Sequence, residues 1–136
     1  MKKSVLLVDD NNVDNFINQK VMSSLGLVKE IHTALNGEQA LNIFNQYQNG
    51  TIAIPDVILL DLNMPVMDGL GFIQAFQSLN FPHKENVLII VLTSSSSSED
   101  MNRVKGLGIK HYLTKPLTQE IIQTILHQEF SNQKCA

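Results

Sequence analysis

The feature that most constrains this chain is a fivefold alternation of short apolar runs with longer segments of helical periodicity. The apolar runs lie at residues 4–8, 29–34, 57–60, 87–92 and 111–114. Segments with helical spacing begin near residues 13, 36, 70, 99 and 118. Parallel strands need crossover connections, so this alternation predicts a parallel sheet with helices on both faces. The strands are apolar almost throughout, as a sheet covered on both faces requires.

Two of the helical segments carry recognisable end signals. In residues 13–25, apolar side chains recur at helical spacing at Val13, Phe16, Ile17, Val21 and Leu25. Gly26 follows as the expected C-terminal cap of that helix. Asn36 precedes Gln39 by three positions, which is typical of a capping box at the start of the second helix.

Length and composition indicate one packed domain. The 136 residues are 43% hydrophobic and 17% charged. We expect a single domain over residues 1–136, with a core at about 3–130 and a short tail at 131–136.

Charge and cysteine content exclude several classes of protein. A formal net charge of −3 with scattered basic residues argues against a nucleic-acid partner. The single cysteine, Cys135, can form no internal disulfide and has no zinc-ligand partners. The apolar run from Val5 to Val8 is too short for a signal peptide or a membrane span. We therefore expect a cytoplasmic protein with no membrane partner.

Polar side chains collect where four of the predicted strands end. They are Asp9-Asp10, Asp61, Thr93-Ser94 and Lys115-Pro116. Taken singly, each is ordinary: an Asp pair can cap a helix, and a lysine is usually a surface residue. Together they matter, because ligands of open α/β sheets bind at the carboxyl ends of the strands. Three carboxylates at one edge repel each other unless a cation compensates, and oxygen ligands favour a hard ion such as Mg²⁺.

In this order and at these spacings, the motifs resemble those of response-regulator receiver domains, the CheY-like family of two-component systems. The likeness extends from about Lys3 to Phe130 and includes the run Leu-Leu-Asp-Leu-Asn-Met-Pro-Val-Met-Asp-Gly at 59–69. It implies an α/β fold: a doubly wound, flavodoxin-like (βα)5 sandwich of three layers. Its five-stranded parallel sheet would have the order 2-1-3-4-5.

The resemblance also implies a site. Asp61 would accept a phosphoryl group from a phosphohistidine of a sensor histidine kinase or a histidine phosphotransfer protein. Asp10 and Asp61 would bind Mg²⁺, or Mn²⁺, directly, with the backbone carbonyl of Asn63 as a third ligand. Asp9 would act mainly through a bound water.

The remaining motif residues would couple modification to signalling. Lys115, followed by a cis peptide bond to Pro116, would pair with a phosphoryl oxygen. The Thr93 hydroxyl would do the same and pull on the loop at 94–98. Tyr112 is either a switch that follows Thr93 or simply a half-buried amphipathic residue. A downstream target would bind the face formed by the helix at 99–107, the strand at 111–114 and the last helix, in a monomer or weak dimer.

Three functions are compatible with these residues. The first is a phosphorylation-dependent switch that is not an enzyme, although it assists its own phosphorylation and slow autodephosphorylation. The second is a phosphorelay intermediate that passes the phosphoryl group to a histidine phosphotransfer protein. The third, a metal-dependent phosphohydrolase, is disfavoured because such enzymes place an acid two residues after the nucleophile, where this chain has Asn63.

Overall fold

A computed structural model describes residues 3–48, 54–94 and 97–131, without the side chains of residues 48 and 131. In chain order its elements are β1 (Lys3–Val8), α1 (Asn12–Ser24), β2 (Val28–Ala34), α2 (Gly37–Gln48), β3 (Val57–Leu60), α3 (Gly69–Ser78), the 3₁₀ helix η1 (Lys84–Asn86), β4 (Leu88–Thr93), α4 (Ser98–Gly106), β5 (His111–Thr114) and α5 (Gln119–Ser131). Strands and helices alternate as predicted, and the short η1 is an addition that the sequence pattern did not indicate. Parts of the predicted serine loop (95–96) and tail (132–136) lie outside the described residues.

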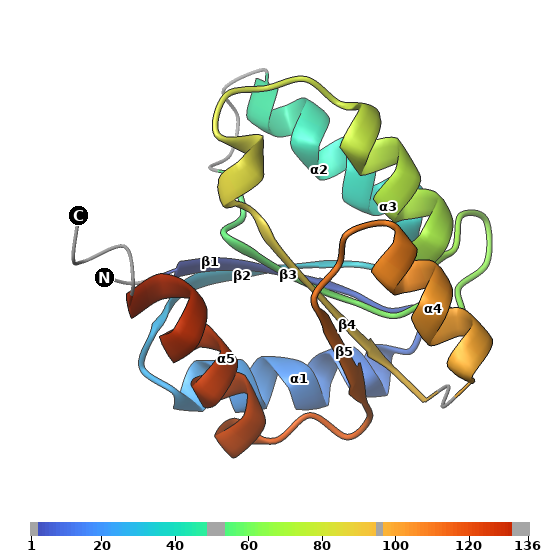
Figure 1. Cartoon of the computed structure of the whole chain (residues 1–136). Helices are drawn as coiled ribbons and strands as arrows, with labels where there is room; N and C mark the ends of the chain where they lie inside the picture. The colour runs from blue at the N-terminus through green and yellow to red at the C-terminus, as the bar shows by residue number, and fades with distance from the viewer. Residues whose placement is uncertain (1–2, 49–53, 95–96, 132–136) are drawn as a thin grey trace.

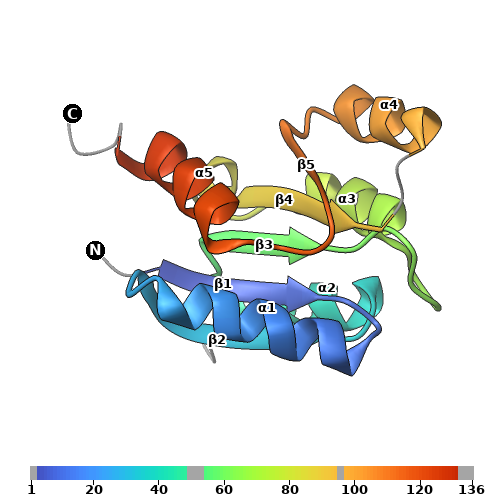
Figure 2. The same ribbon diagram turned by 90° about the horizontal axis from the view of Figure 1, so that it is seen from below.

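The strands form one parallel sheet in the order β2-β1-β3-β4-β5, which confirms the expected topology. In the register, Val8 pairs with Ala34 of β2 and Leu60 of β3, and Thr93 pairs with Thr114 of β5. Because all neighbours are parallel, their carboxyl ends meet at one edge of the sheet. Figure 1 shows α1 and α5 on one face of the sheet and α2, α3 and α4 on the other. In Figure 2, which is seen from below, α1 lies in front of β1 and β2.

Successive strand residues point into two separate cores. Leu6 and Val8 pack with residues of α2, α3 and α4, whereas Val5 and Leu7 pack with residues of α1 and α5. The first core contains an aromatic group in which the Phe44 and Phe76 rings meet edge to face, 5.1 Å apart. A large apolar side chain stabilises the fold by about 2 kcal/mol when fully buried, so both faces hold the sheet firmly.

The helix ends follow the sequence signals. The Asn11 side chain caps α1 by accepting from the N–H groups of Val13 and Asp14. Gly26, with φ of 70°, supplies the left-handed residue after the helix. The Asn36 side chain accepts from the Gln39 N–H at 2.9 Å, which confirms one half of the expected capping box at α2; the Gln39 side chain accepts from the Leu35 N–H instead.

Helix α1 buries a different face from the one that the apolar spacing predicts. Its first three apolar residues, Val13, Phe16 and Ile17, are 64%, 59% and 44% exposed. The buried residues are instead Asn15, Asn18 and Met22. The periodicity predicted the helix correctly but not the face that it buries, because Asn15 is drawn inward by a hydrogen bond to the Asp9 carbonyl oxygen.

Within the described ranges, no helix combines the length and the apolar character needed to cross a membrane.

Candidate functional site

The polar residues at the strand ends are held by the sheet itself. The backbone N–H groups of Asp9, Asp61 and Lys115 donate to carbonyls of neighbouring strands at 3.1, 2.9 and 2.8 Å. Each bond extends the ladder one residue past its strand. The three side chains therefore start from fixed backbone positions at one edge of the sheet, as the sequence predicts.

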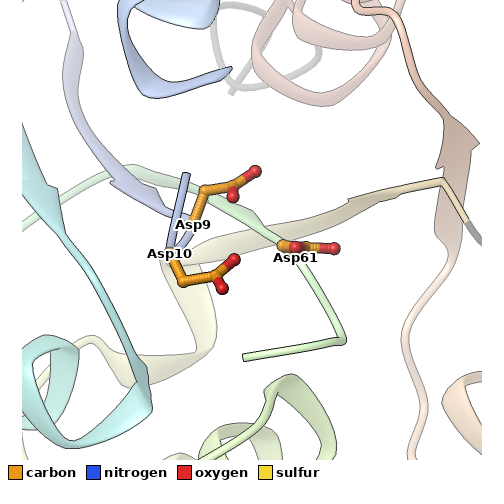
Figure 3. Close-up of side chains that lie close together, drawn as sticks. All are labelled: Asp9, Asp10 and Asp61. Carbon is orange, nitrogen blue, oxygen red and sulfur yellow. The ribbon is translucent and has the colours of Figure 1, made fainter. Parts of the chain in front are cut away.

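Three carboxylates converge at this edge. Asp9 and Asp10 follow β1, Asp61 follows β3, and Figure 3 shows the three side chains close together. One oxygen from each can be chosen so that all lie within 4.8 Å of one another. Asp9 and Asp61 are buried, whereas Asp10 is exposed.

This donor set fits a small, hard divalent cation. All three ligands are carboxylate oxygens, which Mg²⁺ prefers, and Mg²⁺ commonly keeps several waters while binding few carboxylates. The exposed Asp10 leaves one side of the cluster accessible to such waters. The acidic cluster could therefore hold a metal ion.

Lys115 supplies positive charge to the same cluster. Its ammonium group donates to Asp9 Oδ2 at 2.7 Å and to Asp14 Oδ2 at 2.8 Å. It lies 3.7 Å from Asp61 Oδ2, too far for a hydrogen bond. The cation is thus bonded to two carboxylates other than the expected acceptor.

The environment keeps Lys115 charged. Burial alone lowers its pKa, but the hydrogen bonds to Asp14 and Asp9 and the nearby charges of Asp61 and Asp9 outweigh this effect. The pKa of Lys115 therefore lies well above its ordinary range, and the group is an ammonium at any physiological pH.

Asp61 has the opposite character, because its charged form is disfavoured. Burial raises the pKa of Asp61, the ammonium of Lys115 lowers it, and the charge of Asp9 raises it again. Hydrogen bonds from the Thr93 hydroxyl and the Asn63 backbone N–H lower it without cancelling the rise. An ionised Asp61 is consequently under-compensated and is a suitable place for added positive charge.

The loop after Asp61 is built from close backbone contacts. The Gly69 N–H donates to the Leu62 carbonyl at 2.9 Å, and the Asp68 side chain caps α3 by accepting from the Gly71 N–H. The side chain of Asn63 is exposed within this loop. The loop therefore holds the backbone beside Asp61 while leaving its outer side open.

The structure places the other predicted residues in two groups. Thr93 is fully buried at the end of β4 and lowers the pKa of Asp61, so it belongs to the cluster. Pro116 follows a cis peptide bond, as the resemblance implies, and is exposed. Tyr112 is half-buried on β5 against the core formed with α2, α3 and α4, and its switch role stays a prediction.

Asp14 is the residue that sequence reasoning missed. An acid in the first turn of a helix is common, because it favours the helix dipole, and this ordinary explanation conceals any second role. Only the approach of the β5–α5 connection to α1 shows that Asp14 contacts Lys115.

Comparisons with known proteins agree with this geometry. A family model described as "Response regulator receiver domain" matches residues 5–127. "Two-component response regulator 24" of Arabidopsis thaliana is 32% identical over 127 residues, which cover 93% of this chain and 84% of that protein.

Solved structures give the same result. The crystal structure of a two-component response regulator from Cytophaga hutchinsonii has a TM-score of 0.84 and 29% identity, covering 96% of this chain and 99% of that one. The phosphorylated cyanobacterial phytochrome response regulator RcpA has a TM-score of 0.80 and 26% identity, covering 97% and 96%.

Proposed function

The chain belongs to the response-regulator receiver family, whose domains are phosphorylation-dependent switches, and from that premise we propose that Asp61 is its phosphoryl acceptor in a Mg²⁺-dependent reaction. The donor is the phosphohistidine of a sensor histidine kinase or of a histidine phosphotransfer protein. The observation that carries this proposal is the convergence of Asp9, Asp10 and Asp61 at one sheet edge with Lys115 beside them.

In the transfer, a carboxylate oxygen of Asp61 attacks the phosphorus atom of the phosphohistidine. A phosphorus–oxygen bond forms, the phosphorus–nitrogen bond breaks, and the imidazole nitrogen of the donor keeps the electron pair and takes up a proton. Positioning and charge neutralisation provide most of the catalysis in phosphoryl transfer. Asp61 is well positioned because its backbone N–H donates to the Val8 carbonyl of the sheet at 2.9 Å.

The acids and the lysine provide the charge neutralisation. Asp10 and Asp61, with the backbone carbonyl of Asn63, are the residues that would hold Mg²⁺, and Asp9 would act through a water. When bound, the ion supplies neutralising charge to the transferring oxygens. Lys115 moves from its carboxylate partners to a phosphoryl oxygen as a compact point charge.

Signalling follows from a change of hydrogen-bond partner at Thr93. In this structure the Thr93 side chain lies close enough to the Asp61 carboxylate to lower its pKa. After modification, the acceptor becomes a phosphoryl oxygen farther from β3, and the end of β4 follows it. We place the output on the face formed by α4, β5 and α5, with Tyr112 on β5 as the residue that responds.

The test is phosphorylation by acetyl phosphate, followed by intact-protein mass spectrometry. We expect one phosphoryl group to be added with Mg²⁺ and little without it. Asp61→Asn should abolish the addition, and Asp10→Ala should reduce it strongly. Asp68→Asn is the matched control, because it changes a nearby exposed acid that only caps α3. A metal-independent adduct, or one retained in Asp61→Asn, would overturn the proposal.

The same pocket could serve a terminal switch or a relay intermediate. A second experiment separates them: labelled phosphoprotein is mixed with a histidine phosphotransfer domain. Transfer of the label to that domain identifies a relay, whereas retention with slow hydrolysis identifies a terminal switch.

A further inference from the structure

Lys115 is held away from Asp61 by a carboxylate that lies outside the acidic cluster. Asp14 Oδ2 accepts from the ammonium at 2.8 Å, almost the same distance as Asp9 Oδ2 at 2.7 Å, while Asp61 Oδ2 is 3.7 Å away. An ammonium group has three donors, so two strong partners largely fix its position. Asp14 therefore pulls the cation toward α1.

Asp14 is well placed to exert this pull. Its backbone N–H donates to the Asn11 side chain at 3.1 Å, which locks it into the capped first turn of α1. The Asp14 side chain is 33% exposed, compared with 4% for Asp9. A partly solvated carboxylate loses its cation at lower cost than a buried one, because water replaces the lost contact. Of the two contacts, the one to Asp14 is thus the easier to break.

Resting on the function proposed above, we propose that Asp14 is a positioning residue that holds Lys115 clear of Asp61 until a phosphoryl group arrives. With Asp14 in place, Lys115 competes less for the oxygens of Asp61. When an anionic phosphoryl group binds, Lys115 leaves Asp14 and pairs with it.

Neutralising Asp14 should therefore change the affinities for two ligands in opposite directions. In Asp14→Asn, Lys115 rests fully on Asp9 and Asp61 and competes with a cation for their oxygens. Mg²⁺ should then bind more weakly. A phosphoryl mimic should bind more tightly, because Lys115 no longer has to leave a second carboxylate to reach it.

The experiment measures two dissociation constants by calorimetry, for Mg²⁺ alone and for beryllofluoride at saturating Mg²⁺. For Asp14→Asn we expect the affinity for Mg²⁺ to fall and that for beryllofluoride to rise, each by about two- to fivefold, as for other partly exposed ion pairs. Asp14→Glu keeps a carboxylate and should restore both affinities toward those of the parent protein.

A double-mutant cycle shows whether Asp14 acts through Lys115 or by its own charge. In a Lys115→Met background, Asp14→Asn should change neither affinity. Glu38→Gln is the matched control, because Glu38 is an exposed acid in the first turn of α2 and should leave both affinities unchanged. Urea unfolding of each variant verifies that it is folded at the temperature of the titrations.

The outcomes separate the two proposals. If the unsubstituted protein binds both probes and Asp14→Asn binds them equally well, the positioning role is wrong and the proposed function stands. The positioning role is also wrong if the effects of Asp14→Asn persist in Lys115→Met. If the unsubstituted protein binds neither probe, the proposed function itself fails.

Discussion

A Cβ atom placed on Gly69 would lie 2.5 Å from the carbonyl oxygen of Asp61. The same atom would be 2.8 Å from the Leu62 Cα, so backbone surrounds this position on the side of the acceptor. Backbone atoms cannot rotate away as a flexible side chain can. The first residue of α3 therefore packs directly against the segment that carries Asp61.

Gly69→Ala is expected to damage both the fold and the site. The added methyl group should force the acceptor loop to shift, with a loss of about 2 kcal/mol in the free energy of unfolding, as for other overpacked positions. The displaced Asp61 should also bind Mg²⁺ more weakly. Urea unfolding and Mg²⁺ titration measure the two effects.

Gly106→Ala is the control for this substitution. Gly106 is the last residue of α4, and an added Cβ would meet nothing within 4 Å. Alanine there should stabilise the protein slightly, by up to about 0.5 kcal/mol, because it favours the helix. Equal stability losses in the two variants would show that close packing at Gly69 is not the cause.

Asp61→Asn should stabilise the metal-free protein at neutral pH. The pKa of Asp61 lies above its ordinary value of 3.8, mainly because of burial, so the folded state keeps a proton that the unfolded state has released. Stability is therefore lost as pH rises from 3.8 through the folded pKa. At neutral pH the amide removes that cost, with an expected gain of about 1 kcal/mol.

Urea unfolding in a chelator, at neutral and at acidic pH, tests this prediction. The advantage of Asp61→Asn should shrink at acidic pH, where Asp61 of the parent protein is protonated. Asp68→Asn should match the parent protein at both pH values, because asparagine caps a helix as well as aspartate does. If Asp61→Asn is less stable than the parent protein at neutral pH, the folded state stabilises the ionised form of Asp61 and the prediction is wrong.

Lys115→Met should destabilise the metal-free protein but should favour metal binding. Without the ammonium, the buried Asp9 loses its hydrogen-bond partner beside Asp61. The free energy of unfolding of the metal-free protein should fall by about 2 kcal/mol, which is less than for a fully buried pair because Lys115 is partly exposed. Mg²⁺ can replace the lost charge without competition from lysine. Thermal unfolding with and without Mg²⁺ should show a larger metal-induced shift in this variant.

The pH dependence gives an independent measure of the same contact. The folded pKa of Lys115 is raised above the ordinary value of 10.5, although burial opposes this, because Asp14 and Asp9 bond the charged form. The stabilisation of the folded state by charged Lys115 is thus fully present below pH 10.5 and is lost as pH rises above it. The parent protein should lose stability in strong alkali more steeply than Lys115→Met. The exposed Lys105→Met serves as control and should lose stability as steeply as the parent protein. A loss in Lys115→Met as steep as in the parent would contradict the assignment.

The alternation in the sequence was sufficient to predict a parallel sheet and the composition of the acidic cluster, whereas the strand order came from the resemblance to receiver domains. Alternation of apolar runs and helical periods implies a parallel sheet, and a parallel sheet brings Asp9, Asp10, Asp61, Thr93 and Lys115 to one edge. These are consequences of backbone geometry, which local sequence reports well.

What the sequence could not predict depends on contacts between distant segments. The apolar spacing of α1 did not reveal that Phe16 is exposed and Asn15 buried, because the inward pull on Asn15 comes from the Asp9 carbonyl. The ion pair of Asp14 with Lys115 joins residues 101 positions apart, and no local pattern distinguishes Asp14 from an ordinary acid near a helix start.

Locating the modified residue by chemical trapping tests the central claim most directly. Borohydride reduces an aspartyl phosphate to homoserine, which peptide mass spectrometry assigns to one position. After acetyl phosphate treatment with Mg²⁺, homoserine should appear at residue 61 and should be nearly lost when a chelator replaces the metal. Homoserine at residue 9 or 10, or an equal yield at residue 61 without metal, would contradict the account.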